Sequence, residues 1–175
     1  MTTVLFFKGD IAALMAFCLA AMAASPQDDK KPDLSGTWKL DTAKSDFGMM
    51  PPPDSQTSVI EHKDPKLKVK TTTKGGMQEG ESESNYTTDG EQSTNQMGPM
   101  DVKSTAKWEG KKLVMHSKAD MQGNEILIDL TYSLSDDAKV MTVDLVFKSP
   151  MGEGTMKQVF NKSDAAQDTH AAPKN

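Results

Sequence analysis

The sequence predicts an all-β protein, an antiparallel up-and-down β-barrel of about 8–10 strands. Three observations lead to this prediction. Turn-forming pairs such as Asp64-Pro65, Gly75-Gly76 and Glu109-Gly110 recur at short intervals. The segments between them alternate apolar and polar residues, which is the period of a strand with one buried face. Beyond the N-terminal segment, no stretch shows the apolar face of an amphipathic helix.

The alternation is clearest over 126–134, where five apolar residues are separated by Asp129, Thr131 and Ser133 on the opposite face. Only 46–55, which contains a triple proline, is long enough for the crossover of a β-sandwich, so a closed barrel is favoured. In chain order, the predicted strands lie within 34–40, 57–62, 67–71, 79–83, 102–108, 113–115, 126–134, 141–147 and 156–160.

The first residues have the features of a signal peptide. Lys8 precedes an apolar run over 11–23 that is too short to cross a bilayer as a helix. Ala21 and Ala23 are the small residues that signal peptidase accepts, so we predict a signal peptide helix in 1–23, cut after Ala23. An uncleaved N-terminal anchor is the alternative. The signal places the protein in the periplasm or outside the cell, without stable membrane insertion after cleavage.

The rest of the chain divides into three parts. Residues 24–33 are polar and bracketed by prolines, which predicts a flexible linker. Residues 34–162 form the predicted barrel domain, and 163–175 have no apolar periodicity, which predicts a disordered tail. The only cysteine, Cys18, is lost with the signal peptide, so disulfides and thiolate sites are excluded from the exported chain.

The charge composition limits the partners. All 20 residues in the Lys and Arg count are lysine, against 25 Asp and Glu, and the formal net charge is −5. Such a chain does not suit nucleic acid, because phosphate neutralisation needs a basic surface and base readout relies on bidentate arginine. Only 6% of residues are aromatic, so we expect an interior of aliphatic side chains, methionine and threonine.

A motif opens the predicted domain. Gly36-Thr37-Trp38 resembles the Gly-x-Trp signature in the first strand of lipocalins and fatty-acid-binding proteins. Stretches at 41–45, 60–65, 89–90, 108–111 and 131–135 resemble a group of small secreted bacterial lipocalin-like proteins of unassigned function. The resemblance implies that Trp38 plugs the closed end of the barrel.

The chain also departs from this superfamily. Relatives carry a late arginine that stacks on the signature tryptophan, whereas here only a lysine, Lys157 or Lys162, can cover it. Intracellular fatty-acid carriers hold a carboxylate with arginine inside the barrel, and this chain has none. The departure favours a neutral or weakly polar ligand over a fatty acid.

Methionine and histidine are the residues that can carry site chemistry. Met49-Met50 and Met97-Gly98-Pro99-Met100 offer soft thioether ligands for Cu(I), although methionine also fills cores that are poor in aromatics. His62, His116 and His170 stand outside any nucleophile or metal-ligand motif. We therefore predict no catalytic residue, no metal ligand set and no cofactor.

We predict an exported, monomeric protein that binds a small apolar or amphipathic molecule inside its barrel without catalysing a reaction. Two alternatives stay open. One is an envelope protein-interaction module that uses the loops 46–55 and 90–99 on a scaffold barrel. The other is a copper- or cation-binding protein that uses methionine thioethers. The residues predicted to line the ligand site are Trp38, Val69, Ala106, Met115, Ile128, Tyr132 and Phe147.

Overall fold

The computed structural model describes residues 30–76 and 79–163, which contain ten strands. The predicted signal peptide 1–23, most of the predicted linker and the predicted tail beyond residue 163 lie outside the described residues. No helix long and apolar enough to span a membrane occurs within the described ranges. The strands are β1 (Gly36–Leu40), β2 (Ser55–Lys63), β3 (Lys66–Lys74), β4 (Gly80–Thr87), β5 (Asp89–Met97), β6 (Met100–Glu109), β7 (Lys112–Met121), β8 (Asn124–Leu134), β9 (Val140–Ser149) and β10 (Gly152–Ser163).

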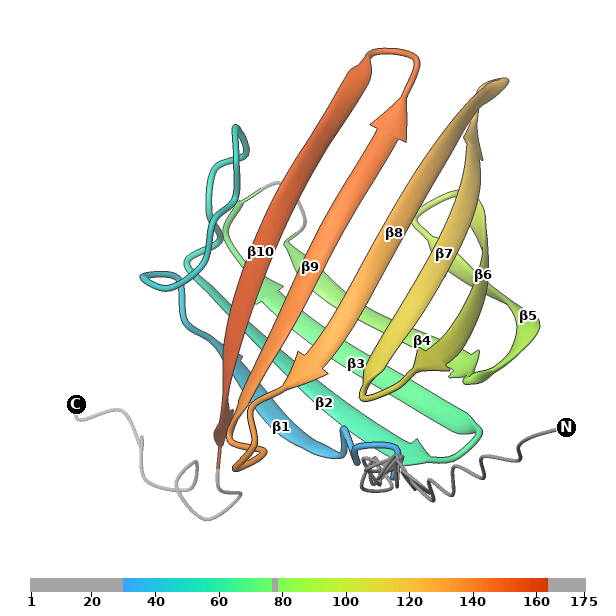
Figure 1. Ribbon diagram of the computed structural model, residues 1–175. Coiled ribbons are helices and arrows are strands. Elements are labelled where there is room, and N and C mark those ends of the chain that lie inside the picture. The colour runs from blue at the N-terminus through green and yellow to red at the C-terminus, as the bar shows by residue number, and fades with distance from the viewer. Residues whose placement is uncertain (1–29, 77–78, 164–175) are drawn as a thin grey trace, which may run out of the picture.

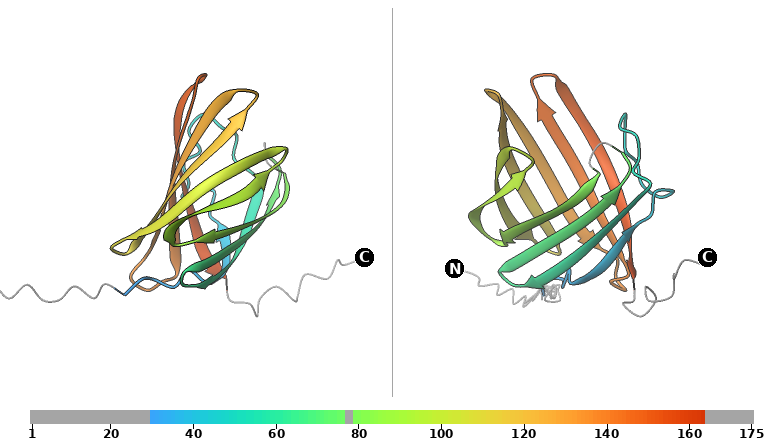
Figure 2. Two further views of the ribbon diagram at one scale, coloured as in Figure 1. Left: turned by 90° about the vertical axis from the view of Figure 1, so that its right-hand side faces the viewer. Right: turned by 180° about the vertical axis from the view of Figure 1, so that it is seen from behind.

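The strands form one antiparallel sheet that curls into a nearly closed barrel (Figures 1 and 2). Sequence neighbours pair from β1 to β4 and from β5 to β10, and β1 closes onto β10. The predicted up-and-down barrel is therefore confirmed. Several strands are longer than their apolar alternation: β7 covers Lys112–Met121, whereas the sequence predicts only 113–115.

The prediction of a loop over 90–99 is wrong. Asp89–Met97 forms β5, which pairs with β6 along most of its length. The strand lacks apolar alternation because both of its faces are polar: Ser93 and Asn95 lie on the inner face, opposite residues of β6, and the outer face meets solvent. The interaction-module alternative thereby loses one of its two loops, while most of 46–55 is a loop as predicted.

No strand ladder connects β4 to β5. Hydrogen bonds from side chains hold these two strands together instead. Asn95 takes the place of a peptide unit: its Oδ1 accepts the Asn85 N–H at 2.7 Å, and its Nδ2 donates to the Asn85 carbonyl at 3.0 Å. Ser93 Oγ accepts the Thr87 N–H at 3.2 Å. These bonds cover two strand edges that would otherwise be exposed.

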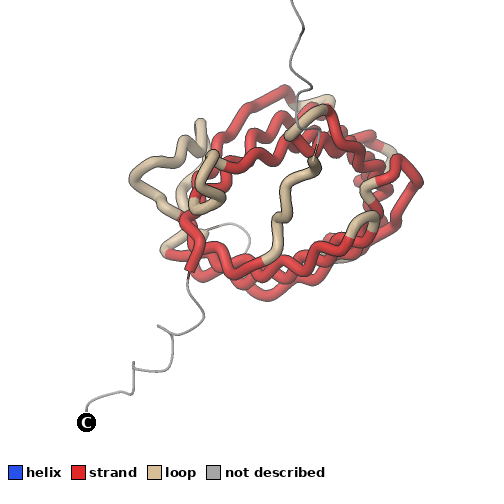
Figure 3. The backbone as a smooth tube through the Cα atoms, turned by 60° about the horizontal axis from the view of Figure 1, so that its bottom comes forward, coloured by secondary structure: helices blue, strands red, loops and turns tan. Residues whose placement is uncertain are grey.

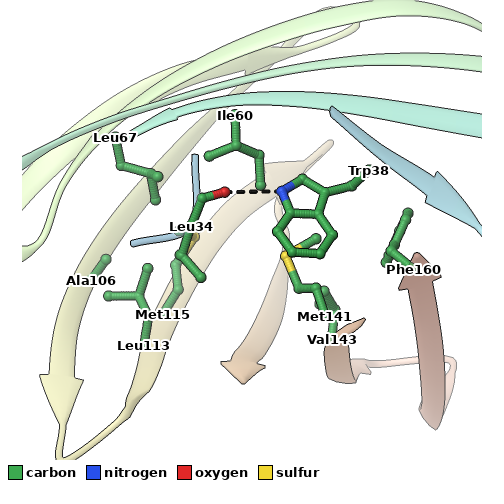
Figure 4. Close-up of a cluster of buried hydrophobic side chains, with 10 residues drawn as sticks. All are labelled: Leu34, Trp38, Ile60, Leu67, Ala106, Leu113, Met115, Met141, Val143 and Phe160. Carbon is green, nitrogen blue, oxygen red and sulfur yellow. Dashed lines mark hydrogen bonds between the residues drawn. The ribbon is translucent and has the colours of Figure 1, made fainter. Parts of the chain in front are cut away.

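The lower end of the barrel is closed around Trp38. The indole is fully buried, and its Nε1–H donates to the Leu34 carbonyl at 2.9 Å (Figure 4). Lys162 Nζ lies 5.2 Å from the ring centroid, in a cation–π contact. Of the two lysines expected to cover the indole, Lys162 does so. Lys157 lies further along β10, where its backbone bonds to that of Asp46.

Gly36 makes room for that lysine. A Cβ at this position would lie 2.6 Å from Lys162 Cε, and the φ of +142° is one that other residues rarely adopt. The apolar side chains around the indole form what we call the floor cluster. Its buried members are Leu34, Trp38, Ile60, Leu67, Ala106, Leu113, Met115, Met141, Val143 and Phe160.

A chain segment just before β1 crosses this end of the barrel (Figure 3). The Leu34 N–H donates to His62 Nδ1 at 3.4 Å. Ser35 Oγ accepts the His62 N–H at 3.0 Å and donates to the His62 carbonyl at 3.1 Å. His62 thus lies near the end of the β2–β3 hairpin, and its side chain is only 5% exposed.

Two carboxylates hold the same segment. Asp64 accepts from Lys31 Nζ at 2.7 Å and from Thr88 Oγ1 at 2.6 Å, and these bonds lower its pKa. Asp33 accepts the Ser35 N–H at 2.9 Å, and its hydrogen bonds to Ser35 lower its pKa as well. A carboxylate whose pKa is lowered by folding stabilises the fold above its unfolded pKa and loses that effect as the pH falls.

We therefore expect the stability of the barrel to be nearly constant from about pH 7 to 5 and to fall below about pH 4, as Asp33 and Asp64 become protonated. The midpoint of urea unfolding at pH 6 and at pH 3 measures this. Asp64→Asn is expected to have a lower midpoint at pH 6 and a smaller drop on acidification. An unchanged drop in this variant would contradict the role of the carboxylate.

Trp38→Phe tests the floor. Phenylalanine fills most of the volume but leaves the buried Leu34 carbonyl unpaired, which is expected to cost about 1–3 kcal/mol in the free energy of unfolding. Trp108→Phe is the matched control, because the buried Nε1 of Trp108 has no partner among the described atoms. Equal losses in both variants would contradict a specific role of the Trp38 hydrogen bond.

Candidate functional site: the uncharged barrel lumen

The strand register identifies the side chains that face the interior. Residues paired across neighbouring strands share a face of the sheet, and the buried residues mark which face is inside. We call the interior above the floor cluster the lumen. Two rows of cross-strand partners follow the inner face. One row starts at Trp38 in the floor and continues through Ser58, Thr71 and Ser82 on one wall. The other row runs along the opposite wall through Ser93, Ser104, Ser117, Ile128, Phe147 and Gly154.

The interior face is uncharged. In the described residues, the inner positions of β2, β3, β4, β6, β7, β8 and β9 hold no Asp, Glu, Lys or Arg. On the inner face of β10 the exception is Lys162, which lies against Trp38 at the floor. Charges gather on the outer face, where Lys68 and Glu83 form a 2.9 Å ion pair. A ligand in the lumen therefore meets no opposite charge.

Solvent reaches the lumen but not the floor. The floor cluster is buried, whereas Val69, Ile128, Leu145 and Phe147 on the inner face above it are only half-buried. A small cavity of about 80 Å³ lies just above the floor. A larger hollow of about 530 Å³ lies at the β2–β3 hairpin, where outward-facing charged residues and the inner-face residues Ile60, Leu67 and Tyr86 line it together.

The small cavity combines apolar and neutral polar groups. Burial raises the pKa of Tyr132, and the neighbouring Tyr86 adds to the effect, so the phenol stays protonated at neutral pH. The polar side chains are all uncharged, and the remainder of the lining is aliphatic or aromatic. The lining residues are Gln56, Ser58, Ile60, Val69, Thr71, Leu130, Tyr132, Met141, Val143, Gln158 and Phe160.

Hydroxyl groups occupy the middle of the two rows. Ser58 and Thr71 lie 3.1 Å apart, and Ser104 and Ser117 lie 2.8 Å apart, each pair joined by a hydrogen bond. Sequence reasoning missed the three serines because it expected an interior of aliphatic side chains, methionine and threonine. The signal was present: Ser104 and Ser117 stand at apolar-phase positions of their strands.

Phe147 lies flat against the wall of the lumen. Its ring packs on its cross-strand partner Gly154, where a Cβ would come within 2.3 Å of Phe147 Cε1. Gly154 has an ordinary backbone φ, so the backbone conformation does not require glycine. The absence of a side chain instead leaves the space that the Phe147 ring occupies.

The histidines do not build a second site. His116 is exposed on the outer face, where its Nδ1 lies 2.7 Å from Asp129 Oδ1. His62 is buried beside Trp108, and its Nε2 has no partner among the described atoms. His170 lies outside the described residues. The part of the chain that the structure describes has no group of three or more His, Cys, Asp or Glu placed to hold a metal ion.

The seven residues predicted for the ligand site all lie on the inner face, at three depths. Trp38, Ala106 and Met115 belong to the floor cluster. Val69 and Tyr132 border the small cavity, and Ile128 and Phe147 pair with each other higher up the wall. Their contact with a ligand stays a prediction, and for the first three the structure assigns a packing role.

This geometry defines a lipocalin-like β-barrel with an uncharged lumen. No family model and no curated protein matches the chain. Among solved structures, secretory abundant heat soluble protein 4 from Ramazzottius varieornatus has a TM-score of 0.51 and 19% identity, covering 77% of this chain and 97% of that one.

A second secretory abundant heat soluble protein from that organism, from a dimer sample, has a TM-score of 0.50 and 14% identity, over 74% and 94% of the two chains. A zebrafish ileal bile acid-binding protein complexed with cholic acid has a TM-score of 0.49 and 12% identity, over 74% and 98%. At these identities the first two similarities show the fold alone.

Gly154→Ala tests the wall of the lumen. The new methyl group overlaps the Phe147 ring, which must turn away from β10 toward the lumen. We expect weaker binding of a neutral fluorescent probe, N-phenyl-1-naphthylamine, by about tenfold, the effect of about 1.4 kcal/mol. Restored binding in Gly154→Ala/Phe147→Leu supports the steric cause. Unchanged binding in the single variant would contradict it.

Proposed function

We propose that this protein is an exported carrier that binds an uncharged apolar or amphipathic small molecule in its lumen. The observation that carries the proposal is the absence of charged side chains from the inner positions of the described strands around the lumen. Hydroxyl and amide groups lie among apolar side chains there, which suits a ligand with an apolar body and a few neutral polar groups.

A charged ligand fits this lumen poorly. Moving a carboxylate out of water is costly unless it is paired and hydrogen-bonded. The chain has no arginine, and the one lysine on the inner face of β10 is engaged by Trp38. The lumen therefore disfavours the ionised head group of a fatty acid and accepts a hydroxyl, carbonyl or amide.

Binding without chemistry is part of the proposal. Hydrolytic catalysis needs a nucleophile and a base within hydrogen-bond reach. The two described histidines lie outside the lumen, one below the floor and one on the outer face. Tyr132 is held in its protonated form, and the lumen serines bond to other hydroxyl groups rather than to a base.

Export is proposed from the N-terminal sequence. The apolar run 11–23, the small residues before Ala24 and the resemblance to secreted bacterial lipocalin-like proteins support a cleaved signal peptide and a location in the periplasm or outside the cell. We propose that the mature protein acts as a monomer, since a carrier of this kind is complete within one barrel.

A matched pair of probes tests the proposal. N-phenyl-1-naphthylamine and 1-anilinonaphthalene-8-sulfonate share their rings and differ by a sulfonate. We expect the neutral probe to bind more tightly by about tenfold or more, because no cation in the lumen offsets the desolvation of the sulfonate. Fluorescence titration measures both affinities. Tighter, salt-sensitive binding of the sulfonate would contradict an uncharged site.

Gln158→Lys sharpens this test by placing a cation beside the small cavity. It is expected to weaken binding of the neutral probe and to strengthen binding of the sulfonate. Thr155→Lys adds the same charge on the outer face of β10 and is the control, because Thr155 is exposed. An equal response to both variants would show that the probes bind outside the lumen.

A further inference from the structure

Six of the methionines that the structure describes lie at one end of the barrel, whereas Met115 and Met141 lie in the floor cluster. The up-and-down topology places the connections β1–β2, β5–β6, β7–β8 and β9–β10 at the end opposite the Trp38 floor (Figure 1). Each of these four contains or borders methionine: Met49 and Met50, Met97 and Met100, Met121, and Met151. The connections at the floor end, 64–65, 88, 110–111 and 135–139, contain none. Packing of the floor cluster therefore does not explain the methionines at the opposite end of the barrel, which we call the rim.

Three of these methionines, Met97, Met100 and Met121, occupy inward-phase positions at the ends of neighbouring strands. Met97 and Met100 are direct cross-strand partners that close the β5–β6 hairpin. Val102 pairs with Ala119 at the end of the β6–β7 ladder, and Met100 and Met121 each lie two residues beyond this pair, in the same inward phase of their strands. Paired positions have Cβ atoms about 5 Å apart, which lets three flexible side chains reach a common point.

The chemistry of this cluster is soft and accessible. Thioether sulfur is a ligand for Cu(I) and is not a ligand for Mg²⁺ or Ca²⁺. Met121 is 37% exposed, and Met97 and Met100 are half-buried, so solvent reaches the cluster. By contrast, Met115 and Met141 in the floor cluster are 0% and 1% exposed and serve as packing.

We propose that Met97, Met100 and Met121 form a three-thioether site for a monovalent soft metal ion, Cu(I). The sequence shows Met97 and Met100 on either side of one turn and does not indicate Met121 as a third ligand beside them. The topology supplies it from the next hairpin. None of the three methionines lines the small cavity near the floor, so either proposal can fail without the other.

The test is an anaerobic titration of the full chain with Cu(I) against a chromogenic chelator. We expect one equivalent to bind, and Met100→Leu, which keeps the volume but removes the sulfur, to lower the affinity by about tenfold or more. Met151→Leu is the control, because Met151 is 87% exposed at the tip of another hairpin. Loss in Met100→Leu and in Met121→Leu, but not in the control, supports the site.

A second readout locates the metal. Ag(I) is a stable stand-in for Cu(I), and the methionine methyl signals in NMR report which sulfurs it touches. We expect shifts of the Met97, Met100 and Met121 signals and no shift for Met115 or Met141. Unchanged affinity in Met100→Leu, no binding by the wild type, or shifts spread evenly over all exposed methionines would overturn the proposal.

Discussion

The burial of Trp38 is the interaction on which the rest of the structure depends. The indole makes three kinds of contact. Its N–H donates to the Leu34 carbonyl in the chain before β1, and its ring packs among the floor side chains of both walls. Lys162 of β10 lies over the ring in a cation–π contact. A barrel of this size must have its lower end sealed by large side chains, since otherwise water would reach the floor cluster. Gly36 permits the seal by leaving space for the lysine stem.

The same contact keeps the one lysine on the inner face of β10 at the floor end. Lys162 is the only Lys or Arg that the register places on the inner face of β10, and the indole engages it at the floor. Above the floor, the polar side chains are neutral hydroxyl groups that hydrogen-bond to each other in two pairs, Ser58 with Thr71 and Ser104 with Ser117. The lumen is thereby neutral and partly polar. A neutral environment of this kind selects against ionised ligands through desolvation and leaves size and shape to set affinity.

The apolar alternation predicted the barrel well because a half-buried strand must place its apolar residues on one face; the run from Ile126 to Leu134 shows this directly. It failed at β5, whose inner residues Ser93 and Asn95 are polar. The seven predicted site residues share the inner face, but sequence alone could not separate Met115 in the floor from Phe147 on the wall, because depth along the barrel depends on register. The placement of Met121 and Met100 at neighbouring strand ends depends on register in the same way.

Native mass spectrometry of the protein purified from the cells that produce it tests the uncharged lumen most directly. The account predicts a complex whose added mass is released on denaturation and belongs to a molecule without an ionised group. The same molecule should be lost from Gly154→Ala, where the Phe147 ring enters the lumen. A carried fatty acid or another anion that is retained at neutral pH and lost in Lys162→Met would contradict the account, because it would show that a charge inside the barrel holds the ligand.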